Sequence, residues 1–212
     1  MQSIIKYLFL IAIFLSSSRA HAGAYEDMLQ AISMNHNSEV VALLKKGVDV
    51  DTVNKDGESL LMLATKEGHI NVVKTLIAAK AKIMARNLYG ETALMLAALN
   101  GHLEITKLLL AEGAAIDHAG WTPLMYAAAQ GRIEVMKLLI SKGAKIDAAA
   151  DNGSTALMMA AREGHTQAVL LLMEKGANVN HRTAGGYSPL RVSRERSMDE
   201  VARLLVKAGA KE

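Results

Sequence analysis

Residues 120–143, with the sequence GWTPLMYAAAQGRIEVMKLLISKG, set the pattern for the whole chain. The stretch holds the TPLM motif at residues 122–125, a pair of alanines, Gly131, and a second apolar run that closes at Gly143. The glycine before the Thr or Ser recurs at intervals of 33 or 30 residues, at Gly57, Gly90, Gly120, Gly153 and Gly186. Self-similarity at this period is typical of a protein built from stacked repeats.

The composition limits both the core and the partners. Of the 212 residues, 51% are hydrophobic but only 4% are aromatic, so the core must consist mainly of aliphatic side chains. The net charge is +3, and it falls to +1 when residues 1–22 are removed. This balance gives no reason to expect nucleic acid or a membrane surface as the partner. The chain has no cysteine, which excludes disulfides and thiolate sites.

Residues 1–22 have the three-part layout of a secretory signal peptide. Lys6 is followed by an apolar run from Tyr7 to Leu15, and Ala20-His21-Ala22 forms a small-x-small cleavage site. The run is too short to span a bilayer as a permanent helix, although an uncleaved anchor is the alternative. We predict cleavage near Ala22, a periplasmic or secreted protein, and no membrane association after cleavage.

Residues 23–212 divide into six similar units. In each full unit a Thr or Ser caps a first helix, small residues allow a neighbouring helix to approach, and a glycine turns the chain into a second helix. Lys80 stands where the other units have the closing glycine. The expected units are about 24–53, 54–86, 87–116, 117–149, 150–182 and 183–212.

Several motifs in these units resemble those of ankyrin repeats, whose pattern is G-x-T-P-L-H-x-A-A-x-x-G-H followed by G-A-x-(I/V)-(D/N). The chain has Gly101-His102 and Gly164-His165, and it has GAAID at 113–117 and GANVN at 176–180. The resemblance implies an all-α solenoid of about six stacked helix-turn-helix units with β-turn fingers. It also implies a concave surface that binds other proteins.

Methionine replaces the histidine of the ankyrin pattern in every full unit. The positions are Met62, Met95, Met125 and Met158, and Met159 lies beside the last. Methionine often fills irregular gaps between helices. The alternative is that a ladder of thioether sulfurs captures a soft metal such as Cu(I), which would suit an oxidative- or metal-stress factor.

The unit that starts at Asp117 is three residues shorter than its neighbours before its Gly120. We expect a truncated finger and a notch beside Trp121. The alternative is a neutral deletion, since loops tolerate changes in length.

Aromatic residues mark the expected contact surface. The resemblance implies that residues flanking the first glycine of each unit are contact positions, and Tyr89, Trp121 and Tyr187 occupy them. Tyrosine and tryptophan dominate binding hot spots. Alternatively, these rings pack on the next finger. The predicted partner-binding residues are Leu88, Tyr89, Glu91, Leu99, Trp121, Arg162, Glu163 and Tyr187.

The sequence contains no recognisable catalytic or metal-binding motif, including H-E-x-x-H, G-x-S-x-G and phosphate-binding glycine loops. We therefore predict a monomeric, non-enzymatic protein without cofactor or metal. The expected function is protein–protein interaction in the periplasm. The protein would be an inhibitor, immunity or self-protection protein that covers a periplasmic enzyme with its concave face.

Overall fold

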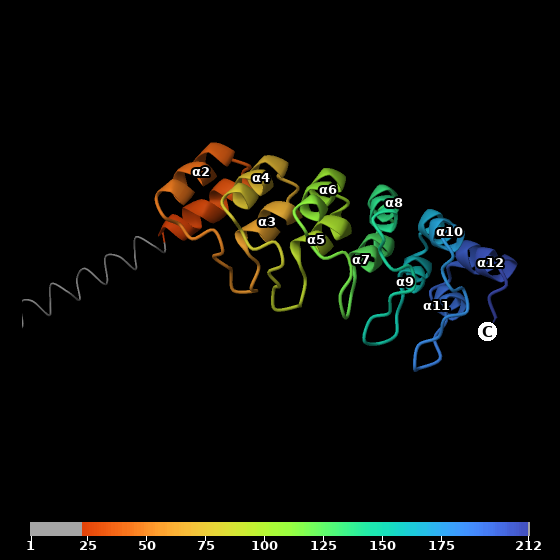
Figure 1. The fold of residues 1–212 in the computed structure, drawn as a ribbon. Coiled ribbons are helices and arrows are strands. Elements are labelled where there is room, and N and C mark those ends of the chain that lie inside the picture. Colours follow the sequence, from red (N-terminus) through yellow and green to blue (C-terminus); the bar gives the residue numbers. More distant parts are fainter. Residues whose placement is uncertain (1–22, 212) are drawn as a thin grey trace, which may run out of the picture. The chain divides into compact units, whose positions relative to one another are not determined.

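The computed structural model describes residues 23–211 (Figure 1). The predicted signal peptide, residues 1–22, lies outside the described residues. The chain divides into two compact units, with the division between Lys82 and Ile83. All of the predicted partner-binding residues belong to the second.

The first compact unit consists of helices around an aliphatic core. Residues 23–33 are helical, and α2 (Asn37–Lys45), α3 (Leu60–Lys66) and α4 (Ile70–Ala78) follow. Helix α4 packs against both α2 and α3. The core between them is completely buried at Val40, Leu60 and Leu76.

The second compact unit arranges four helix pairs in two rows. The pairs are α5 (Ala93–Asn100) with α6 (Leu103–Ala111), α7 (Pro123–Ala129) with α8 (Ile133–Ser141), α9 (Ala156–Glu163) with α10 (Thr166–Glu174), and α11 (Pro189–Glu195) with α12 (Asp199–Lys207). Helices α5, α7, α9 and α11 pack side by side in one row, the inner row, and α6, α8, α10 and α12 form the other. The predicted all-α repeat fold is confirmed.

Local sequence signals set the start of each inner-row helix. The hydroxyl of Thr92, the N-cap of α5, accepts a hydrogen bond from the backbone N–H of Met95. The same cap opens α7 at Thr122, where Pro123 occupies the first turn and needs no hydrogen-bond acceptor for its nitrogen. Each helix therefore begins where its Thr or Ser satisfies an otherwise unpaired N–H.

Left-handed residues end the helices where the sequence predicts them. Gly101 and Gly164 cap α5 and α9 with φ angles of 80° and 75°. Lys80, after α4, has a φ of 69° and so takes a conformation that costs a side chain about 1–2 kcal/mol relative to glycine.

The methionine positions are buried within the helix rows. Met95, Met125 and Met158 are 1–2% exposed, and the paired alanines beside them, such as Ala127 and Ala128, are fully buried. The sulfur of Met95 accepts a hydrogen bond from the backbone N–H of Thr92 at 3.2 Å. These contacts favour gap filling over metal capture as the role of the methionines.

Hydrogen bonds connect the loops of successive repeats. The Asp117 carboxylate accepts the backbone N–H of Lys145 at 3.0 Å, and the Asp147 carboxylate accepts that of Asn178 at 3.0 Å. Met84 takes the corresponding position one unit earlier, and its sulfur accepts the N–H of Ala115 at 3.3 Å. Within the second compact unit, each of these bonds ties one repeat to the backbone that follows the second helix of the next repeat.

Candidate protein-binding surface

The finger of residues 87–91 presents two apolar side chains on a rigid frame. Asn87 is 6% exposed. Its side-chain oxygen accepts the backbone N–H groups of Tyr89 and Glu91 at 3.0 and 2.9 Å, and its amide donates to the Glu91 carboxylate at 2.8 Å. Leu88 and Tyr89 at the tip are each 76% exposed. The finger therefore exposes a leucine and a tyrosine to solvent, while hydrogen bonds hold the turn that carries them.

Trp121, beside the shortened finger, lies in a partly buried cluster. Its ring is 5.2 Å from that of Tyr126 and tilted by 55°, and both rings pack against the core of the second compact unit. The Tyr126 hydroxyl donates to the Glu91 carboxylate at 2.9 Å. Burial and this carboxylate raise the pKa of Tyr126 well above its ordinary value. The phenol thus stays protonated as a hydrogen-bond donor, and the cluster joins two neighbouring repeats of the second compact unit.

Tyr126 was not among the predicted site residues. The sequence does carry a signal for it, because Tyr126 is the one aromatic residue within the inner-row helices. The contact with Glu91 spans 35 residues of sequence and could not be predicted from spacing.

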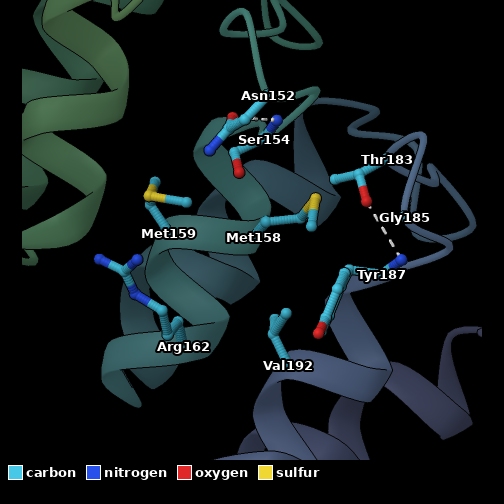
Figure 2. A pocket seen from close by; sticks show the side chains of 9 residues that line it. All are labelled: Asn152, Ser154, Met158, Met159, Arg162, Thr183, Gly185, Tyr187 and Val192. Atoms are coloured by element: carbon cyan, nitrogen blue, oxygen red, sulfur yellow. Dashed lines mark hydrogen bonds between the residues drawn. The ribbon is translucent and has the colours of Figure 1, made fainter.

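Tyr187 and Arg162 line a common pocket between α9 and α11 (Figure 2). Its volume is about 360 Å³. Tyr187 is 40% exposed, and its backbone N–H donates to the Thr183 hydroxyl at 3.1 Å. The guanidinium of Arg191 lies 4.4 Å from the centre of the Tyr187 ring, a favourable cation–π contact.

The remaining predicted residues lie apart from this pocket or at its edge. Glu163 pairs with Arg162 at 2.7 Å, and both side chains are more than a third exposed. Leu99 is partly buried, and its backbone carbonyl accepts a hydrogen bond from the Arg132 side chain at 3.1 Å. The predicted set thus separates into an exposed finger tip, a Glu91–Trp121–Tyr126 cluster and a pocket beside Tyr187.

Within residues 23–211, no three His, Asp or Glu side chains come together in a way that could hold a metal ion. In the same range, no helix has both the length and the apolar character that crossing a bilayer requires.

Comparisons with known proteins agree with the repeat architecture. The family model described as "Ankyrin repeats (3 copies)" matches residues 3–87, 79–150 and 147–212. The crystal structure of the human ASB11 ankyrin repeat domain is similar, with a TM-score of 0.78 and 27% identity over 87% of this chain and 84% of that one. A search of curated proteins finds no significant match. Because the family model covers most of its length, the chain belongs to the ankyrin repeat family.

Proposed function

We propose that this protein inhibits or protects a periplasmic enzyme by covering its active site or substrate groove. Ankyrin repeats indicate a protein–protein interaction module. The enzyme partner and the periplasmic location go beyond that. The periplasmic location is supported by the layout of residues 1–22, which is typical of an export signal.

The finger tip at Leu88 and Tyr89 carries the proposal. Isolated exposed apolar residues are common on surfaces, but two adjacent ones at 76% exposure on a hydrogen-bonded turn form a preorganised contact. A rigid contact loses little conformational entropy on binding, so more of the interaction energy contributes to affinity. A projecting finger of this kind suits insertion into a concave surface such as an active-site groove.

Capture from the host's periplasm tests the proposal. The full chain is expressed, purified and immobilised, and bound proteins are identified by mass spectrometry. Any captured enzyme is then purified and assayed with increasing amounts of the protein. We expect stoichiometric inhibition or protection against inactivation. An enzyme that is bound but unchanged in activity and lifetime would contradict the proposal.

Paired variants assign the contact. Leu88→Ser with Tyr89→Ala should weaken binding by about 30-fold or more, the range of a hot spot of about 2 kcal/mol. Leu170→Ser is the matched control, because Leu170 is also an exposed leucine (44%) but lies on α10, in the other helix row. An equal loss of binding in both variants would contradict the assignment of the finger tip to the interface.

Export has its own test. The chain is expressed in a Gram-negative host, the cells are fractionated, and the N-terminus of the product is sequenced. Recovery from the periplasm with Gly23 as the first residue is expected. A product that keeps residues 1–22 in the cytoplasm would overturn the periplasmic location.

A further inference from the structure

The pocket between α9 and α11 has an apolar interior. Figure 2 shows Met158 and Met159 of α9 on one side, and Val192 of α11 and the ring of Tyr187 on the other. The two methionines are only 2% and 3% exposed, so the pocket opens onto the packed core. A volume of about 360 Å³ falls within the range of sites that hold small ligands, and it accommodates one large side chain.

Positive charge surrounds this apolar interior. Arg162 lies at the edge of the pocket, and its pairing with Glu163 is solvent-exposed. Next to Tyr187, a second depression of about 420 Å³ is lined by Arg182, Gly186, Arg191, Arg194 and Glu195. The charged side chains around the pocket and this depression are therefore four arginines and two glutamates, Glu163 and Glu195. Their net charge is +2.

The exposed ion pairs of Arg162 and Arg191 leave these two side chains able to accept another partner. Arg191 pairs with Glu195 at 2.9 Å, with about half of each side chain exposed. Exposed pairs of this kind contribute little and exchange readily. Arginine can also bind a carboxylate through two parallel hydrogen bonds. The Arg191 guanidinium also lies over the Tyr187 ring, and this contact favours its position before a partner arrives.

We infer that this pocket binds an acidic segment of the partner protein, with one large apolar side chain in the pocket and flanking Asp or Glu side chains on Arg162 and Arg191. The inference rests on the proposed function, which it deepens by giving the chemistry of the partner. Charge complementarity selects the acidic flanks, and the methionine-lined interior selects the apolar residue.

A random 12-residue peptide library displayed on phage is the probe. The full chain is expressed, purified and immobilised for selection, and the enriched peptides are synthesised and their affinities measured. We expect enriched peptides with an apolar residue such as Leu, Met or Phe flanked by Asp or Glu. Their affinity should fall as salt rises.

Variants link the selected peptides to the pocket. Tyr187→Ala should weaken binding by about tenfold or more, as loss of an aromatic anchor does. Arg191→Glu should weaken it further, whereas Arg203→Glu makes the same charge change on α12, outside both depressions, and should have little effect. Val192→Tyr keeps the other residues that line the pocket but should fill its interior. Circular dichroism of each variant checks that it is folded.

The outcomes are distinct. Basic or uncharged peptides, or no enrichment at all, would overturn the inference. So would acidic peptides that bind equally well to Val192→Tyr, or self-association of the chain that Tyr187→Ala abolishes. None of these results bears on enzyme capture through the finger tip, so the proposed function can stand or fail separately.

Discussion

Replacing Gly131 with alanine tests why the turns between paired helices use glycine. Gly131 has a φ of 61°. A left-handed conformation costs an L-residue about 1–2 kcal/mol relative to glycine, and the lower entropy of the unfolded chain offsets about 0.4–1 kcal/mol of this. The backbone alone therefore predicts a loss of about 1 kcal/mol in the free energy of unfolding.

The next unit adds a second contribution. A Cβ at residue 131 would lie 2.9 Å from Nδ1 of His165, closer than real contacts allow. The other ring nitrogen, Nε2, is hydrogen-bonded to the carbonyl of Ala129 at 3.1 Å. The ring cannot retreat without lengthening that bond, which contributes about 1 kcal/mol. We expect a total loss of about 2 kcal/mol for Gly131→Ala.

Two natural replacements show that the backbone angle is not decisive. Asn35 and Ser197 hold the equivalent position in the first and last units, each with a φ of 57°. Side chains therefore fit this backbone at a moderate cost, and the neighbouring histidine adds a second, comparable cost at residue 131.

The assay is urea unfolding followed by circular dichroism, with the slope compared among variants. Gly131→Ala is made in the natural chain and in a His165→Ala background. The cost should fall from about 2 to about 1 kcal/mol when the histidine is absent, a coupling of about 1 kcal/mol. Equal costs in both backgrounds would refute the steric argument and leave backbone strain as the whole effect.

Three further changes follow from other contacts. Lys80→Gly should stabilise the first compact unit by about 0.5–1 kcal/mol because it relieves a left-handed lysine, as thermal unfolding would show. Asn87→Ala should speed amide exchange at Tyr89 and Glu91, which lose their common acceptor. Unfolded tyrosine ionises near pH 10 and folded Tyr126 at a higher pH, so its contribution to stability is complete below about pH 10 and falls as pH rises toward the folded pKa. Urea midpoints from pH 8 to 11 should show this decline, and Tyr126→Phe should reduce it.

The repeat fold could be predicted because its signals are local. The cap at Thr122 and the proline after it act within a few residues of sequence. Their recurrence at a fixed period then predicts which helices pair. The exposed finger tip at Leu88 and Tyr89 also follows from its place beside Gly90 in the repeat.

The rest of the site depends on lateral contacts between units, which periodicity does not specify. Trp121 was grouped with Tyr89 because both flank the first glycine of a unit. In the structure Trp121 packs on Tyr126, whereas the Tyr89 side chain is exposed to solvent. The difference arises because the two residues flank the glycine on opposite sides. Tyr89 comes before its glycine. Trp121 comes after its glycine, at the repeat position of Glu58 and Ser154, which are buried.

Side-chain size at one repeated position decides how neighbouring inner-row helices meet. Tyr126, Met159 and Val192 are equivalent, at intervals of 33 residues. The long phenol of Tyr126 reaches back to Glu91 and bridges two units. Val192 is too short to span the same space, and a pocket remains between α9 and α11. The same position of the repeat therefore forms a bridge in one repeat and leaves a pocket in another. For this reason one substitution, Val192→Tyr, should close the pocket without altering the fold that frames it.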